Sequence, residues 1–198
     1  MSAFDKIAER YDRPERVKNS KQIARSIKEV LRMSQKGTVI DYGSGTGLIG
    51  LDLIEESEAV IFVDKSKKMT EVVERKLLKS PDSQHKVIHG EAEDLIANGL
   101  KADFIIVSLV LHHVEDPGKL IHLLYDLLKP AGKMIVVDFE TTHKEHSGSS
   151  HPSHEFDQKQ LSAIIDSSGF HSIGASVIEL EEPYYGRIPE LFLLVAEK

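Results

Sequence analysis

Hydrophobic residues along the chain follow two different rhythms, which together predict alternating helices and strands. Between residues 15 and 34 they recur at near-helical spacing, so this stretch is expected to form an amphipathic helix that stops before Gly37. From residue 38 onwards, short runs rich in β-branched residues alternate with amphipathic stretches. Such alternation is typical of a parallel sheet with helices on both faces. The expected strands are 38–42, 59–64, 85–90, 103–110 and 132–140, and the expected helices between them are 48–57, 67–79, 92–98 and 117–129.

The last third of the chain follows another pattern. A helix is expected at 157–168 and strands at 171–180 and 190–197. The connection between these two strands is too short for a helical crossover, so they should form an antiparallel hairpin at one edge of the sheet. The predicted fold class is therefore α/β: a doubly wound, seven-stranded, mostly parallel, Rossmann-like sheet with an antiparallel C-terminal hairpin.

The composition narrows the class of protein further. The chain has 198 residues, of which 40% are hydrophobic and 29% charged, as in an ordinary globular domain. It has no cysteine, which excludes disulfides, thiolate metal sites and thiol nucleophiles. No apolar run approaches the roughly 20 residues that cross a bilayer, and the N-terminal charges are not followed by the apolar core of a signal peptide. We therefore expect a cytoplasmic protein without a membrane partner.

A glycine-rich loop, DYGSGTG (41–47), follows the first expected strand. Glycines at such a position permit a tight turn and a close approach of a ligand, and the start of the next helix offers unpaired N–H groups. The second expected strand ends at Asp64, whose carboxylate could accept both hydroxyls of a ribose. Because ligands of open α/β sheets bind at the carboxyl ends of the strands, a nucleoside-containing cofactor is expected here.

Two classes of cofactor compete for this loop. Residues 45–50 satisfy the dinucleotide pattern G-x-G-x-x-G, and Asp64 lies 19 residues after Gly45, so the loop alone does not separate NAD from S-adenosylmethionine. Asp41 favours the second, because a carboxylate there would attract a cationic amino group and repel a pyrophosphate. The acidic run at 90–94 favours it too, since an adenine amino group would need an acceptor after the third strand.

Motifs in a fixed order extend this interpretation over nearly the whole chain. They are FDKIAERYD, VIDYGSGTG, VDKSKKM, GEAEDL, SLVLHHVEDP and LLKPAGKMIVVDF. In this order they resemble class I S-adenosylmethionine-dependent methyltransferases of the small-molecule type, a group that includes the ubiquinone/menaquinone C-methyltransferase-like proteins. The resemblance implies a single domain over 1–198, with a helical lid at 1–36, a cofactor-binding core at 37–140 and a substrate-side loop, helix and hairpin at 141–198.

The resemblance also implies roles for individual residues, with S-adenosylmethionine as the cofactor. Asp41 would lie near the methionine amino group and Asp64 would bind the ribose hydroxyls, although either carboxylate could instead cap a helix. Glu91 or Ala92 would meet the adenine edge, the latter through its backbone N–H. The remaining implied contacts are Gly43, Ser44, Gly45 and Gly47 along the methionine and ribose, Lys65 and Met69 beside the adenine, the backbone of Ser108, and Tyr11 closing over the cofactor.

The expected reaction is methyl transfer to a small-molecule acceptor, driven mainly by alignment of the reacting atoms. His112 and His113 follow the fourth strand and are candidate bases, because imidazole titrates near neutral pH. His113 is expected to face the acceptor, although either ring could be a packing residue. Four histidines in the next loop form two H-x-x-H spacings, but its Ser/Gly content favours a substrate-facing loop over a metal site. They are His143, His146, His151 and His154, and Tyr184 and Tyr185 could add an aromatic wall.

Other functions stay open at this point. An NAD(P)-dependent oxidoreductase and a non-catalytic module that binds S-adenosylmethionine or S-adenosylhomocysteine would both use such a loop. A nucleic-acid partner is not expected, because the net charge is −7 and residues 108–111 read SLVL where amino-methylating DNA and RNA enzymes carry an Asp/Asn-Pro-Pro-aromatic tetrad. The chain could be a monomer or a homodimer.

Overall fold

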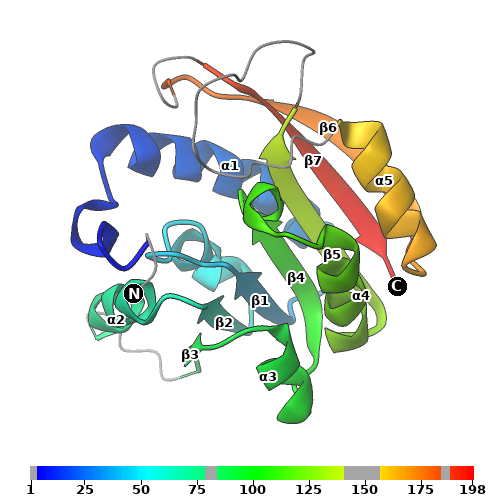
Figure 1. The fold of residues 1–198 in the computed structure, drawn as a ribbon, viewed down its shortest axis with the longest axis horizontal. Coiled ribbons are helices and arrows are strands. Elements are labelled where there is room, and N and C mark those ends of the chain that lie inside the picture. The colour runs from blue at the N-terminus through cyan, green and yellow to red at the C-terminus, as the bar shows by residue number, and fades with distance from the viewer. Residues whose placement is uncertain (1–3, 79–83, 141–156, 184–187) are drawn as a thin grey trace.

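The computed structural model describes residues 4–78, 84–140, 157–183 and 188–198 (Figure 1). The histidines expected to line the loop at 143–154, and Tyr184 and Tyr185, lie outside these residues. The helices are α1 (Pro14–Arg32), α2 (Lys67–Leu77), α3 (Ala92–Ala97), α4 (Pro117–Leu127) and α5 (Gln158–Ser167), with short 3-10 helices η1 (Ala8–Arg10), η2 (Gly50–Glu56) and η3 (Leu111–His113). The strands are β1 (Thr38–Tyr42), β2 (Ala59–Asp64), β3 (Lys86–His89), β4 (Ala102–Ser108), β5 (Leu128–Phe139), β6 (His171–Glu179) and β7 (Glu190–Glu197).

Within the described residues, seven strands form one sheet in the order β3-β2-β1-β4-β5-β7-β6. Strands β1 to β5 pair with one another in parallel, whereas β7 is antiparallel to both β5 and β6. The predicted doubly wound sheet with a C-terminal hairpin is therefore confirmed. Strand order reverses between β1 and β4, so the loops that follow these two strands diverge and leave space at their carboxyl ends.

Two apolar layers cover the sheet, because its central strands carry hydrophobic residues on both faces. On one face, α1, η2 and α2 pack through residues such as Ile27, Leu53 and Val73. On the other face, α3, α4 and α5 pack through residues such as Leu95 and Leu124 (Figure 1). Among the described residues, none of the helices combines the length and the apolar character that crossing a bilayer requires.

Two elements differ from the sequence-based expectation. The helix expected at 48–57 is the 3-10 helix η2, in which the Gly50 N–H is donated to the Asp41 carboxylate, 3.0 Å away. Glycines at 47 and 50 disfavour an α-helix in this stretch. Strand β5 begins at Leu128, earlier than the expected 132, because Leu128 pairs with Ala102 before an irregular step in the register.

Candidate functional site

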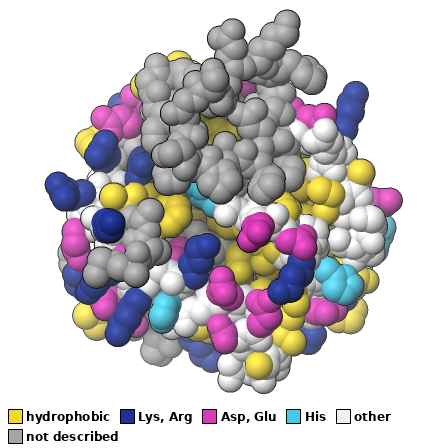
Figure 2. Space-filling model, in the orientation of Figure 1, with side chains coloured by type: hydrophobic (Ala, Val, Ile, Leu, Met, Phe, Trp, Pro, Cys, Tyr) yellow, Lys and Arg dark blue, Asp and Glu magenta, His cyan; other side chains and the backbone are white. Residues whose placement is uncertain are grey.

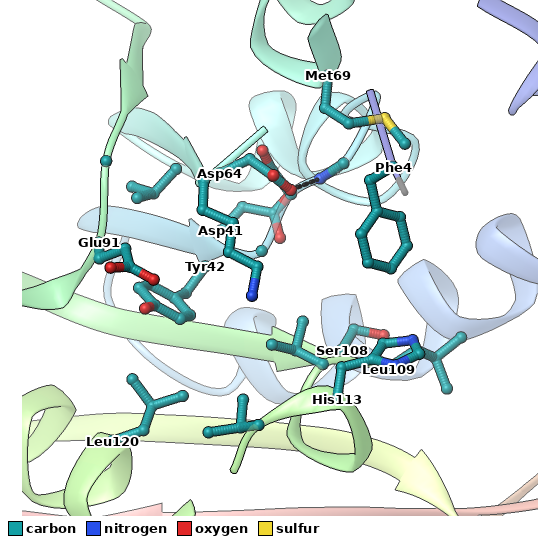
Figure 3. A pocket seen from close by; sticks show the side chains of 18 of the residues that line it. Phe4, Asp41, Tyr42, Asp64, Met69, Glu91, Ser108, Leu109, His113 and Leu120 are labelled. Carbon is teal, nitrogen blue, oxygen red and sulfur yellow. Dashed lines mark hydrogen bonds between the residues drawn. The ribbon is translucent and has the colours of Figure 1, made fainter. Parts of the chain in front are cut away.

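A pocket of about 550 Å³ lies at the carboxyl ends of the central strands, in the size range of small-ligand sites. Its lining comes from the loop after β1, the ends of β2 and β4, the residues after β3, the start of α4 and the N-terminal segment. Figure 3 shows the acidic side chains of Asp41 and Asp64 near one another, with Phe4 and His113 facing the same cavity. The pocket therefore occupies the position at which strand order reverses.

The loop after β1 adopts a backbone that suits glycine. Gly43, Gly45 and Gly47 have φ angles of +72°, +53° and +79°, a region that other residues rarely enter. A Cβ at Gly43 would also lie 2.4 Å from a methyl carbon of Val110. The backbone N–H groups of Gly43 and Ser44 donate to the Val63 carbonyl at 2.8 and 2.9 Å, which fixes the loop against β2. A ligand can thus approach the backbone of this loop closely.

Asp64, the last residue of β2, stabilises the loop from the neighbouring strand. Its Oδ2 accepts a hydrogen bond from the Gly45 N–H at 2.8 Å, and its Oδ1 accepts one from the Ser66 N–H at 2.7 Å. Burial raises the pKa of Asp64, while these two hydrogen bonds act in the opposite direction. Ser66, not Asp64, is the N-cap of α2. A carboxylate offers about four acceptor positions, so two remain for a ligand.

Asp41 is buried at the floor of the pocket. Only 3% of its surface is exposed, and its Oδ2 accepts the Gly50 N–H at 3.0 Å. Burial raises the pKa of Asp41 to about 7, the hydrogen bond from Gly50 opposes this rise, and the charge of Asp64 adds to it. The pocket therefore contains a carboxyl group that a cationic ligand group would convert to the ionised form.

The side of the pocket beyond β3 is organised by α3. Glu91 is the N-cap of α3 and forms a capping box with Asp94, while its side chain lines the pocket. Ala92 is fully buried. Burial raises the pKa of Tyr42 to about 12, so the phenol stays neutral. Ala92, whose backbone N–H was expected at an adenine edge, does not line the pocket.

The two histidines after β4 have different surroundings. His113 lines the pocket, as expected, whereas His112 does not. The Nδ1 atom of His112 lies 2.7 Å from Oδ1 of Asp138, and only 14% of its side chain is exposed. The ring centroids of His112 and His113 are 3.9 Å apart, and the Phe4 ring meets His113 edge-on at 5.3 Å. His113 therefore contacts two aromatic rings.

The N-terminal segment closes one side of the pocket, and Phe4 and Tyr11 contribute to the lining. It is attached mainly by polar contacts, while Ala8 packs against Met69 and Val72 in a small apolar cluster. The attachments are Asp5 to the Ser66 hydroxyl at 2.6 Å, Glu9 to Arg75 at 2.7 Å, and Asp12 to the Thr46 hydroxyl at 2.5 Å and to Lys76 at 2.7 Å.

The charge of the pocket is negative over its described lining. Figure 2 shows acidic side chains gathered around an apolar hollow near the middle of the face. Six carboxylates line the pocket against two lysines, and one of those, Lys119, is paired with Glu93 at 3.0 Å. Such a lining favours a cationic ligand over a pyrophosphate. The carboxylates are Asp41, Asp64, Glu91, Glu93, Glu115 and Asp116.

Most of the residues expected at the site line this one pocket. Three do not, namely Gly47, Ala92 and His112. The buried hydroxyls of Ser44 and Ser108 have no hydrogen-bond partner among the described residues, so they could bond to a ligand. The described residues contain no cluster of three or more His, Asp or Glu side chains that could hold a metal ion. The expected residues that line the pocket are Tyr11, Asp41, Gly43, Ser44, Gly45, Asp64, Lys65, Met69, Glu91, Ser108 and His113.

Sequence reasoning missed several residues of the site. Phe4 and Tyr42 stand inside recognised motifs, in FDKIAERYD and VIDYGSGTG, so their positions gave a signal. The sequence gives no signal for Leu120 of α4, because a leucine in an amphipathic helix is expected to pack in the hydrophobic core. Asp138 gave none either, since nothing in the sequence pairs it with a histidine 26 residues earlier.

The chain is similar in sequence to a family of known domains and to several known proteins. A family model described as a methyltransferase domain matches residues 13–173. An uncharacterized protein of Methanocaldococcus jannaschii is 33% identical over 137 residues, which cover 69% of this chain and 60% of that protein. A demethylmenaquinone methyltransferase of Listeria monocytogenes is 29% identical over 141 residues, which cover 68% of this chain and 60% of the enzyme.

Solved structures share the fold. A SAM-dependent methyltransferase from Aquifex aeolicus matches with a TM-score of 0.74 and 19% identity, over 98% of this chain and 97% of that one. The magnesium protoporphyrin IX methyltransferase of Synechocystis, solved with bound S-adenosylmethionine, matches with a TM-score of 0.70 and 20% identity, over 90% of this chain and 80% of that one. The matched regions span 41–60% of the length of the curated relatives.

Proposed function

Because the chain belongs to the methyltransferase domain family, we propose that it binds S-adenosylmethionine in the pocket above β1 and transfers the methyl group to a small molecule. One observation carries the proposal: the glycine loop, Asp64 and Glu91 follow three adjacent strands and line a single acidic pocket. A nucleoside laid along this edge would meet a carboxylate at the end of each neighbouring strand. The whole of 1–198 would act as one unit, with 1–36 covering the cofactor.

The described side chains fit the three parts of this cofactor. Asp41 and the backbone of the glycine loop would hold the amino-acid part, because a buried carboxyl group matches an ammonium. Asp64 would accept the ribose hydroxyls, and Glu91 would take the adenine amino group. The unpartnered hydroxyls of Ser44 and Ser108 would gain partners when the pocket is filled. Gly45 and Tyr11 would flank the ribose, with Lys65 and Met69 beside the adenine.

The protein's main contribution to the reaction would be alignment. The bound sulfonium supplies an activated methyl group and a thioether leaving group. Phe4, Leu109 and Val110 line the pocket with apolar surface that excludes water from the acceptor side. Alignment of this kind lowers a barrier by roughly 7–11 kcal/mol in favourable cases. His113, which lines the same pocket, would accept a proton from the acceptor.

The alternative functions receive less support. Six carboxylates in the lining would repel the pyrophosphate of NAD(P), and β7 runs antiparallel where the usual dinucleotide-binding sheet is parallel. A binding module without catalysis is not favoured by any contact of the described residues. A turnover assay with a methyl-labelled cofactor and a panel of phenols, amines and quinols distinguishes such a binding module from an enzyme. Quinols belong in the panel because of the name of the Listeria relative.

Calorimetry tests the cofactor directly. We expect S-adenosylmethionine and S-adenosylhomocysteine to bind, and NAD(P) not to. Asp64→Asn should weaken binding by roughly 1–3 kcal/mol, because the ribose loses a charged acceptor while the amide oxygen still accepts a backbone N–H. Asp166→Asn, an exposed carboxylate on α5, is the matched control. Binding of NAD(P) without binding of the sulfonium would refute the proposal.

A further inference from the structure

Asp138, near the end of β5, is a buried carboxylate with three hydrogen bonds and no part in the proposed cofactor site. Only 1% of its surface is exposed. Its Oδ1 accepts the Phe139 N–H at 2.9 Å and lies 2.7 Å from Nδ1 of His112, and its Oδ2 accepts the His112 backbone N–H at 3.3 Å. One carboxylate thus holds His112 at two points, the backbone and the ring.

This arrangement selects one tautomer of His112. An ionised carboxylate has no proton to donate, so a lone pair on Nδ1 would face another lone pair across 2.7 Å. The contact with an ionised carboxylate would therefore favour a proton on Nδ1. The ring, fixed in this way, packs against His113 at a centroid distance of 3.9 Å and an angle of 48°. Phe139 also meets His112 edge-on at 5.1 Å, so the His112 ring packs against two aromatic neighbours.

His113 receives its position from this assembly. Its ring contacts both His112 and Phe4, and it is the one of the two histidines that lines the pocket. We propose that Asp138 is a positioning residue that acts through His112 to orient His113 as the proton acceptor, and that the methyl acceptor carries a protic O–H or N–H. This inference rests on the proposed function, and it adds a residue and a substrate class to it.

The step balances without a further reactant. The acceptor oxygen or nitrogen forms the new bond to the methyl carbon, the S–CH3 bond breaks, and its electron pair returns to sulfur. The proton of the acceptor passes to the ring of His113 and from there to solvent. An acceptor without a proton to lose, such as a thioether, would need neither His113 nor its support.

The tautomer is measurable without any acceptor. Long-range ¹H–¹⁵N spectra of the histidine rings, assigned with His112→Asn and His113→Ala, should show His112 as the Nδ1–H tautomer. In Asp138→Asn the amide cannot accept from all three N–H groups, so the signals of both His112 and His113 should change. Asp103→Asn is the matched control, since Asp103 also accepts a backbone N–H, from Thr38 at 2.8 Å. An Nε2–H tautomer in the wild type, or an unchanged His113 in Asp138→Asn, would overturn the proposal.

Turnover supplies the second readout, with labelled S-adenosylmethionine and with catechol and benzimidazole as probe acceptors. His113→Ala should lower kcat by about 100-fold or more, and added imidazole should restore part of it. Asp138→Asn should lower kcat by at least about 10-fold, with KM for the probe and the cofactor Kd unchanged within about twofold. Full activity of either variant, or no transfer to either probe by a protein that binds the cofactor, would overturn the proposal. Absence of cofactor binding would instead refute the proposed function.

Discussion

The buried carboxyl group of Asp41 should make the empty protein less stable as the pH rises to neutral. Its pKa is about 7 in the folded chain, against 3.8 for an ordinary aspartate. Below pH 3.8 the group is protonated in both the folded and the unfolded states, and above 7 it is ionised in both. Between these values the folded state binds the extra proton, so the free energy of unfolding falls by about 1.4 kcal/mol per pH unit. The whole loss amounts to about 4 kcal/mol.

Asp41→Asn isolates this contribution. The amide oxygen still accepts the Gly50 N–H, but the side chain no longer ionises. Urea unfolding of both proteins at pH 5, 6, 7 and 8 gives the stability difference at each pH, in which groups far from the pocket cancel. The free energy of unfolding of the variant should rise relative to that of the wild type by about 3 kcal/mol between pH 5 and pH 8, because the wild-type pKa is about 7. Asp166→Asn, which replaces an exposed carboxylate, should show no such trend.

Binding of a cation should reverse the effect. A ligand ammonium beside Asp41 favours the ionised carboxylate, so S-adenosylmethionine should release close to one proton from the wild type at pH 6 and none from Asp41→Asn. Calorimetry in two buffers of different ionisation enthalpy measures this release. Parallel pH–stability curves for the two proteins, or equal proton release, would refute the reasoning about burial.

Two further predictions concern packing around the site. Gly50→Ala should lower the free energy of unfolding by about 1–3 kcal/mol, because a Cβ there would lie 2.5 Å from the Phe62 ring. Gly174→Ala is the control, since a Cβ at that position meets nothing within 4 Å. Equal losses of stability for the two variants in urea unfolding would contradict the prediction. Asn19→Ala should lower it by roughly 1–3 kcal/mol, because this buried amide bonds both backbone groups of Glu182, at 3.1 and 3.3 Å. Unchanged hydrogen exchange at the Glu182 amide would count against it.

The fold was predictable because its signals are local and repeated. Each central strand is a run of apolar residues that matches a sheet buried on both faces, as in β2 and β4. The short link before β7 excluded a helical crossover. Two predictions about secondary structure were wrong. The early start of β5 depends on pairing between Leu128 and Ala102, which are far apart in the sequence. The 3-10 helix η2 combines the local effect of two glycines with a hydrogen bond from the Gly50 N–H to Asp41.

The site was predictable where one motif contains the whole geometry. The glycine loop and Asp64 were expected together, and the structure joins them through the bond from the Gly45 N–H. The pairing of His112 with Asp138 was not predictable, because it depends on the register that places Ser108 beside Val137 in β4 and β5. A lone acid after an apolar strand gives no indication of its partner.

The way in which the N-terminal segment is attached should affect how quickly a ligand leaves the pocket. Its polar attachments include two ion pairs near the surface, from Glu9 to Arg75 and from Asp12 to Lys76. Attractions of this kind weaken as dissolved ions screen them. Added salt should therefore increase the dissociation rate of a bound ligand more than it changes the stability of the folded core. The residence time of a ligand in the pocket should then depend on ionic strength.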